Sequence, residues 1–153
     1  MARIVVGSDH AGYRLKELIK RRLQEAGHEV IDVGTHSEEP CDYPDYAAAA
    51  VREFFERNAR FGILVCATGV GMSIVANKFR GIRAALAYNV HVARLSREHN
   101  HANFLCIGAR MIPEEEALRM VDAWLGAREE GGRHEKRVRK ISLIEEEVYG
   151  GGS

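Results

Sequence analysis

The chain has 153 residues, enough for one domain with a substantial hydrophobic core. Lysine plus arginine and aspartate plus glutamate number 22 each, so the net charge gives no reason to expect binding to nucleic acid or to a membrane surface. No apolar run approaches the roughly 20 residues of a membrane-spanning helix, and three cysteines without CxxC spacing indicate a reducing cytoplasm.

Short apolar runs alternate with amphipathic helical patterns along the chain. The runs predict strands at 4–6, 29–33, 62–65, 83–86 and 104–107. Helices are expected at about 11–26, from 42, at about 89–99, from 113 and at about 134–148, with Gly27 ending the first. In the second of these, the predicted apolar face comprises Ala47, Ala50, Val51, Phe54 and Phe55.

This alternation predicts a three-layer, doubly wound (Rossmann-like) α/β fold. Its five-stranded, mostly parallel sheet would be covered by helices on both faces. Residues 1–149 are expected to form a single domain, and residues 150–153, which are glycines and a serine, a flexible tail.

The most informative segment is CATGVGMSIVANK, which begins at Cys66. The thiol stands where a strand pattern gives way to a loop with Gly69 and Gly71, followed by a helix start. The first amides of a helix lack internal partners and lie at the positive end of its dipole, so they bind phosphates or oxyanions and favour a nearby thiolate. A base beside such a loop has what is needed to remove a proton from carbon next to a carbonyl.

A cysteine in such a sequence can also be a buried structural residue or the nucleophile of a phosphatase loop. Free cysteine is commonly a small buried hydrophobe, and this interpretation fits Cys106, which lies inside a predicted strand. A cysteine phosphatase loop needs Cys-x5-Arg, but the sixth residue after Cys66 is Met72. The phosphatase interpretation therefore fails.

Further polar residues follow other predicted strands, at the edge of a parallel sheet where ligands bind. Asp9 and His10 follow the first strand, Tyr43 follows the second, and Arg110 follows the last. An acid–base pair such as Asp9 and His10 suits the opening of a sugar ring or the binding of hydroxyls. The alternative is that Asp9 caps the first helix and His10 is solvated.

Two more groups of polar residues lie elsewhere. Arg133 and Arg137 are four residues apart, so they share a helical face that suits a phosphate, unless they belong to an exposed basic turn. His99 shares a helical stripe with apolar residues, where a satisfied core histidine is the usual interpretation. The sequence His99-Asn100-His101 invites a metal site, but no carboxylate or cysteine cluster completes it, so no metal is expected.

The order of elements bears on His99. It ends a predicted helix and precedes a strand, which places it near the amino-terminal edge of the sheet, whereas Cys66 lies at the opposite edge. If both act in one site, His99 must come from a neighbouring subunit. Function at His99 therefore predicts a dimer.

Several motifs together resemble those of the type B ribose-5-phosphate isomerases, a family that also includes allose-6-phosphate and galactose-6-phosphate isomerases. The resemblance runs from Ile4 to about Ile144. In chain order it rests on GSDHAG, DYPDYA, CATGVGMSIVANKFRGIRAA, LSREHNHANFLCIGAR and VDAWLGAREEGGRHEKRV.

The resemblance implies interconversion of D-ribose 5-phosphate and D-ribulose 5-phosphate through an enediolate. Cys66 would move the proton between the two sugar carbons, Thr68 would assist proton movement between the oxygens, and His99 would assist ring opening as an acid. The loop whose amides would stabilise the enediolate comprises Ala67, Thr68, Gly69, Val70 and Gly71. The other implied contacts are Asp9, His10 and Tyr43 around the sugar, Asn100 at a hydroxyl, and Arg110, Arg133 and Arg137 at the phosphate, with His10 as a further phosphate contact.

The resemblance also implies a cytoplasmic enzyme of carbohydrate metabolism and the pentose phosphate pathway. It would be a homodimer with shared active sites, or a tetramer, without metal or organic cofactor. Many relatives have glycine where this chain has Ala67. Alanine would strain the loop if that position needed a positive φ, and a small adjustment is expected.

Other functions remain to be weighed against this one. An allose or galactose 6-phosphate isomerase needs only room for one more carbon, and the sequence leaves that choice open. A noncatalytic partner subunit is disfavoured because the candidate catalytic residues are all present. A dinucleotide-binding module is disfavoured because the first turn reads GSDHAG rather than GxGxxG. Nucleic acid binding is disfavoured because glutamates interrupt the basic patch at 133–140 and follow it.

Overall fold

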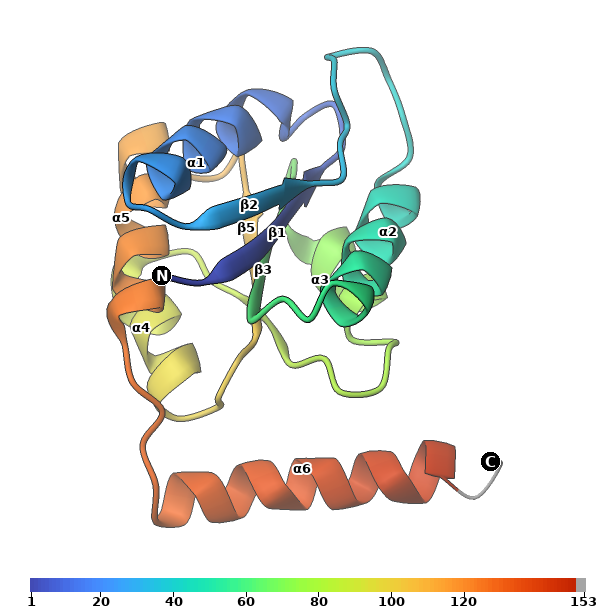
Figure 1. The fold of residues 1–153 in the computed structure, drawn as a ribbon, viewed down its shortest axis with the longest axis vertical. Coiled ribbons are helices and arrows are strands. Elements are labelled where there is room, and N and C mark those ends of the chain that lie inside the picture. The colour runs from blue at the N-terminus through green and yellow to red at the C-terminus, as the bar shows by residue number, and fades with distance from the viewer. Residues whose placement is uncertain (151–153) are drawn as a thin grey trace.

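The computed structural model describes residues 1–150 as five strands and six helices (Figure 1). The strands are β1 (Arg3–Ser8), β2 (Glu29–Asp32), β3 (Phe61–Cys66), β4 (Ala84–Leu86) and β5 (Phe104–Gly108). The helices are α1 (Tyr13–Glu25), α2 (Tyr43–Glu56), α3 (Val70–Ala76), α4 (Val90–Glu98), α5 (Glu114–Gly126) and α6 (Arg133–Tyr149). Three of the four residues of the predicted tail, 151–153, lie outside the described residues.

All strand pairs are parallel, and the strand order is β2-β1-β3-β5-β4. The chain moves from β1 outward to β2 and then returns to β3 on the other side of β1, which creates a switch point between β1 and β3. In sheets of this kind the crevice at the switch point, beyond the carboxyl ends of the strands, is where ligands bind. The predicted doubly wound fold is therefore confirmed, with every strand parallel.

The strands read as continuous apolar runs because both faces of the sheet are buried. Ile63 and Val65 of β3 pack in the cluster formed with α1, α4 and α5, whereas Leu64 and Cys66 pack in the cluster formed with α2 and α3. Figure 1 shows these two helical layers on opposite sides of the sheet. The alternation directs the Cys66 side chain toward the layer that contains α3.

The helices mostly follow their predicted patterns, with one difference, at Phe55. Gly27 ends α1 with a φ of +90°, as expected of a glycine after a helix. In α2, Phe55 was predicted to face the core, but it is 49% exposed and packs edge-on against Phe54, so that prediction was wrong. In α1, Lys16 is fully buried although its side chain carries a charge.

Helix α6 lies apart from the two layers, across the end of the molecule opposite the loop after β2 (Figure 1). It contacts the body near its end through the Arg80–Glu146 ion pair at 2.6 Å. Much of its apolar surface is open: Leu143, Ile144 and Val148 are each at least 60% exposed. Among residues 1–150, no helix is both long and apolar enough to cross a membrane.

Candidate active site

Cys66 is the last residue of β3 and is almost completely buried. Its Sγ accepts a hydrogen bond from the Gly69 N–H at 3.2 Å. Gly69 has a φ of +80°, and a Cβ there would lie 2.7 Å from the Leu86 side chain, so this turn requires glycine. The tight turn thereby brings a backbone amide to the thiol.

A cavity of about 310 Å³ opens beside Cys66, within the size range of small-ligand sites. Its lining residues are Asp9, Tyr43, Cys66, Ala67, Thr68, Val70, Gly71 and Ile74. The cavity lies at the carboxyl ends of β1 and β3, which is the switch point of the sheet. The structure therefore brings together the Cys66 loop, Asp9 and Tyr43, as the sequence predicted.

Asp9 both shapes the first turn and faces the cavity. Its Oδ1 accepts the Gly12 N–H at 3.1 Å, and its own N–H donates to the Val65 carbonyl at 3.3 Å. The helix α1 begins only at Tyr13, with Gly12 at the cap position. Asp9 thus organises the turn before the helix while remaining in the cavity wall.

Unlike its neighbour Asp9, His10 lies against Cys41 in the loop after β2. Its Nδ1 accepts the Cys41 N–H at 3.1 Å and lies 3.9 Å from the Cys41 Sγ. His10 therefore contacts the loop after β2 and does not line the Cys66 cavity. Tyr43 does reach the cavity, and its ring packs so closely on Gly71 that a Cβ at Gly71 would overlap it.

Thr68 and Ala67 are held by Val70 of α3 and by residues that follow two other strands. The Thr68 Oγ1 accepts the Val70 N–H at 3.2 Å, and the Thr68 carbonyl accepts the Tyr88 hydroxyl at 2.9 Å. The Ala67 carbonyl accepts the N–H of Arg110, whose side chain is exposed. Ala67 is not among the residues with positive φ, so the strain considered for this position is absent. Tyr88 was not predicted, although it follows β4 at the same edge of the sheet.

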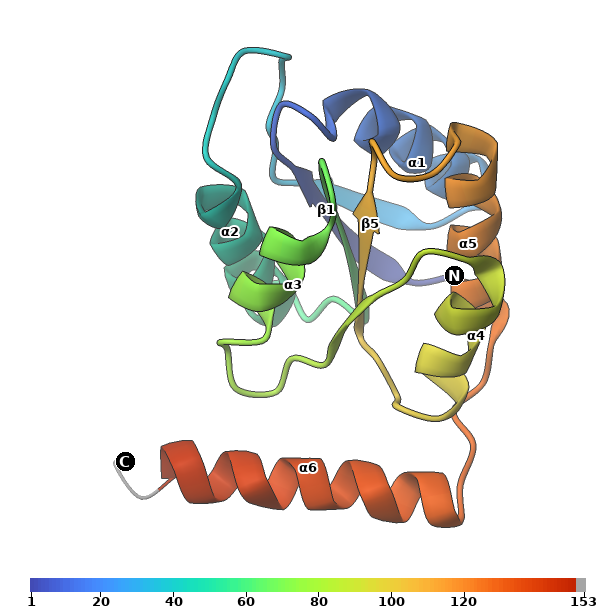
Figure 2. The ribbon, with the colours of Figure 1, turned by 180° about the vertical axis from the view of Figure 1, so that it is seen from behind.

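His99 and Asn100 line a second cavity of about 500 Å³ together with Arg137 of α6. This cavity and the Cys66 cavity share no lining residue. His99 follows α4 and precedes the start of β5, whereas Cys66 ends β3, so the two residues lie at opposite ends of the strands, as predicted. Figure 2 shows α6 crossing the end of the molecule at which β5 begins. Arg133 is exposed at the start of α6 and is not part of the lining of this cavity.

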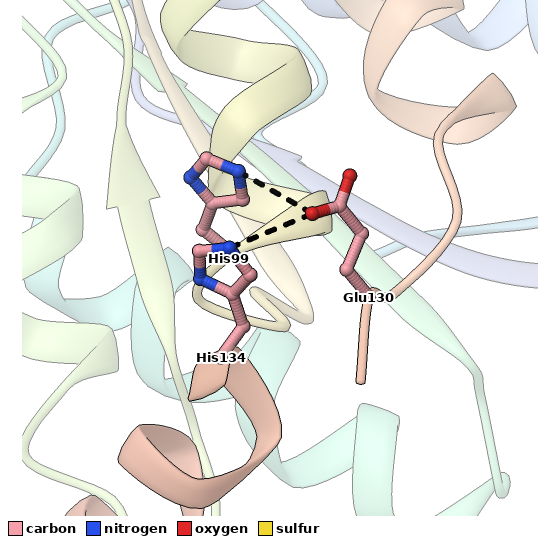
Figure 3. Close-up of side chains that lie close together, drawn as sticks. All are labelled: His99, Glu130 and His134. Carbon is pink, nitrogen blue, oxygen red and sulfur yellow. Dashed lines mark ion pairs between the residues drawn. The ribbon is translucent and has the colours of Figure 1, made fainter. Parts of the chain in front are cut away.

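Three side chains gather at the second cavity (Figure 3). The rings of His99 and His134 stack with centroids 3.9 Å apart and planes at 3°. One Glu130 carboxylate oxygen lies 3.6 Å from the His99 Nε2 and 3.5 Å from the His134 Nε2. The pKa of His134 lies below its ordinary value. Partial burial disfavours the charged form of the ring, and His99 and Arg133 add positive charge nearby. Sequence reasoning missed Glu130 and His134.

Two further residues discussed in the sequence, His101 and Cys106, lie outside both cavities. His101 has partners other than those of His99: its Nε2 contacts the Glu130 carbonyl at 2.9 Å and its Nδ1 lies 3.7 Å from Glu129. The His99-Asn100-His101 segment therefore does not present two histidines to one point. Cys106 is fully buried, and burial together with the nearby Cys66 raises the pKa of its thiol, which fits the structural role predicted for it.

The fold and the Cys66 cavity place this chain among doubly wound α/β proteins that bind a small ligand at the switch point of a parallel sheet. The profile of the Ribose/Galactose Isomerase family matches residues 4–141. The chain belongs to this family, which confirms the resemblance seen in its motifs.

Individual relatives agree with this assignment. The chain is 49% identical over 146 residues to ribose-5-phosphate isomerase B of Escherichia coli (strain K12), covering 95% of this chain and 98% of that protein. Ribose-5-phosphate isomerase B of Clostridium thermocellum matches with a TM-score of 0.92 and 48% identity, covering 95% and 99% of the two chains. The Mycoplasma genitalium enzyme with bound ribulose-5-phosphate matches with a TM-score of 0.90 and 38% identity, covering 95% and 97%.

Proposed function

We propose that this chain interconverts D-ribose 5-phosphate and D-ribulose 5-phosphate. The observation that carries the proposal is the position of Cys66: its thiol lies in the switch-point cavity and accepts the Gly69 N–H at 3.2 Å. The relative of known structure that holds ribulose-5-phosphate shares 38% of its sequence with this chain, and the E. coli relative shares 49%.

The cavity suits proton transfer within a sugar. Cys66, as thiolate, takes the proton from C2 of the open-chain aldose, the electrons of that bond form the C1–C2 double bond, and the C1 carbonyl oxygen becomes an enediolate oxyanion. The thiol then returns its proton to C1, and the hydroxyl proton on O2 moves to O1, which leaves a ketone at C2. Backbone amides of the loop 67–71 offset the oxyanion charge.

Other lining residues fit supporting roles. Thr68 accepts the Val70 N–H, so its own hydroxyl hydrogen is available to carry the proton from O2 to O1. Asp9 and Tyr43 line the cavity where sugar hydroxyls would lie. Arg110, at the carboxyl end of β5, stands at the same edge of the sheet and is a phosphate contact in this proposal, with His10 as a second.

A complete site requires a second copy of the chain. Ring opening by His99 and phosphate binding by Arg133 and Arg137 cannot serve the Cys66 of the same chain, because these residues lie at the other edge of the sheet. We therefore infer a homodimer, alone or within a tetramer, in which each subunit lends His99 and Asn100 to the other. The exposed apolar residues of α6 supply surface for such an interface.

The three cysteines also bear on where the enzyme works. Cys41, Cys66 and Cys106 are all free thiols, and the mechanism needs Cys66 to remain one. A reducing compartment satisfies this requirement. We infer a cytoplasmic enzyme of carbohydrate metabolism that belongs to the pentose phosphate pathway.

The test is ribulose 5-phosphate formation from ribose 5-phosphate by the purified, metal-free chain. We expect wild-type turnover that collapses in Cys66→Ala, while Cys106→Ala, which removes a buried thiol outside the cavity, retains it. Activity surviving in Cys66→Ala would refute the cysteine base. An inactive wild type would refute the pentose assignment, and turnover of allose or galactose 6-phosphate would then identify a hexose phosphate isomerase.

A further inference from the structure

His99, Glu130 and His134 bring three potential metal ligands to one point from three different segments (Figure 3). His99 follows α4, His134 lies in the first turn of α6, and Glu130 lies in the segment that joins α5 to α6. The histidine nitrogens and the carboxylate oxygen all lie within 4.8 Å of one another. Two imidazoles and one carboxylate are a donor set that zinc accepts in proteins.

The distances suit a single cation. Zinc binds imidazole nitrogen and carboxylate oxygen at about 2.0–2.2 Å, so two ligand atoms around a tetrahedral ion lie about 3.4 Å apart. The Glu130 oxygen lies 3.6 Å from the His99 Nε2 and 3.5 Å from the His134 Nε2. We propose that these three residues bind a divalent cation of the zinc type, with its fourth position open to water from the adjacent cavity.

The backbone holds Glu130 at this point. Its N–H donates to the Glu98 carbonyl at 2.9 Å, and its carbonyl accepts a hydrogen bond from the ring of His101 at 2.9 Å. Glu98 directly precedes His99 in the chain, and His101 follows it by two residues. The segment between α5 and α6 is therefore fastened to the end of α4, and the carboxylate is kept near both rings.

Binding requires a rotation of the two rings. Because the ring planes are nearly parallel, at 3°, the in-plane nitrogen lone pairs lie in separate parallel planes, whereas a shared ion needs them to converge. The χ2 torsion of histidine is broad, so a rotation costs little. The His99 and Glu130 side chains are 35% and 50% exposed, whereas His134 is 11% exposed, so His99 and Glu130 make most of this adjustment.

The charges around the site predict a moderate affinity for a divalent ion. Glu130 supplies a single negative charge, while Arg133 and Arg137 of α6 bring positive charge close to His134. Glu129 is close by but is engaged with Arg97 at 3.0 Å. A divalent ion is thus incompletely neutralised, and binding that is reversible by a chelator is expected.

Occupancy would have a consequence that rests on the proposed function. A zinc-bound His99 has its nitrogen lone pair committed to the metal and cannot exchange a proton with the sugar ring oxygen at that atom. Zinc would then inhibit the isomerase, and removal of zinc by a chelator would restore activity. Metal binding itself does not depend on the catalytic assignment.

The test is equilibrium dialysis of metal-free protein against zinc chloride, with the bound metal counted per chain. We expect one zinc per chain in wild type and at least about tenfold weaker binding in Glu130→Gln and in His134→Gln, because each removes a direct ligand. His91→Gln, which alters an exposed histidine on α4, should bind as wild type does. Cobalt(II) absorption provides a second readout, because nitrogen and oxygen ligation lacks the thiolate charge-transfer band.

Zinc bound equally by wild type, Glu130→Gln and His134→Gln would overturn the proposal. Loss of binding in Cys41→Ser would overturn it as well, because it would move the bound zinc to the Cys41 thiol, which lies 3.9 Å from the His10 Nδ1. Circular dichroism of each variant excludes misfolding as the cause. Absence of wild-type isomerase activity without zinc would count against the proposed function alone, since the dialysis result needs no turnover.

Discussion

Cys66 lies at the carboxyl ends of the strands and His99 at their amino ends, and each lines a different cavity. No rotation of side chains can bring them to a common substrate within one chain. If both act on the sugar, every active site combines the Cys66 of one subunit with the His99 of another. The arrangement makes the mixing of inactive variants informative.

Mixed dimers of Cys66→Ala and His99→Asn should recover activity that neither variant has alone. Random pairing of equal amounts makes half of the dimers mixed, and each mixed dimer holds one intact site out of two, so about a quarter of wild-type activity is expected. Turnover after unfolding and refolding the two variants together measures it. Failure to recover activity, with mixed dimers shown by mass spectrometry, would contradict the shared site.

Gly71→Ala should damage the site although alanine is the better helix former. A Cβ at position 71 would overlap the Tyr43 ring, so the ring must leave the wall of the cavity. We expect kcat/KM to fall by about tenfold to a hundredfold, the range seen when a positioning group is misplaced. Gly126→Ala is the matched control, because no other atom lies within 4 Å of its added Cβ, and it should keep wild-type kinetics.

The buried Lys16–Asp32 pair should matter to stability. The Lys16 ammonium is fully buried and lies 2.7 Å from one Asp32 oxygen and 2.8 Å from the Thr35 carbonyl. Asp32→Asn leaves a buried charge with a weakened partner and should cost about 3–5 kcal/mol in the free energy of unfolding. Urea denaturation measures this loss. Asp122→Asn, which breaks an exposed pair with Arg22, should change stability little.

The same pair predicts a dependence on acid pH. Burial alone would raise the pKa of Asp32, but hydrogen bonds from Lys16 and the Gly34 N–H hold the pKa below its ordinary value of 3.8. A carboxyl with a depressed folded pKa contributes stability above the unfolded value and loses it as the pH falls through the folded value. The gap in unfolding free energy between wild type and Asp32→Asn should therefore narrow below about pH 3.8. A constant gap between pH 7 and pH 3 would contradict this assignment.

Much of the site was predictable because its signals are local. A strand pattern ending at Cys66, glycines after it, and Asp9 after the first strand place side chains at one edge of a parallel sheet. Tyr88 and Phe55 were not predicted correctly. The Tyr88 hydroxyl donates to the Thr68 carbonyl from 20 residues away in the sequence, and Phe55 is exposed although it lies on the apolar face of its helix. Both features depend on how the helices and strands pack.

The sequence by itself determined the alternation of elements, the parallel sheet, the family and the identity of the candidate base. These follow from hydrophobic periodicity and from motifs that are contiguous in the chain. The order of elements also placed His99 and Cys66 at opposite ends of the strands. Only the tertiary structure decided that Glu130 and His134 meet His99 and that Lys16 is buried against Asp32. The physical reason is that these contacts join residues far apart in the sequence. The packing of helices on the sheet sets the distances between such residues, and no local sequence pattern encodes them.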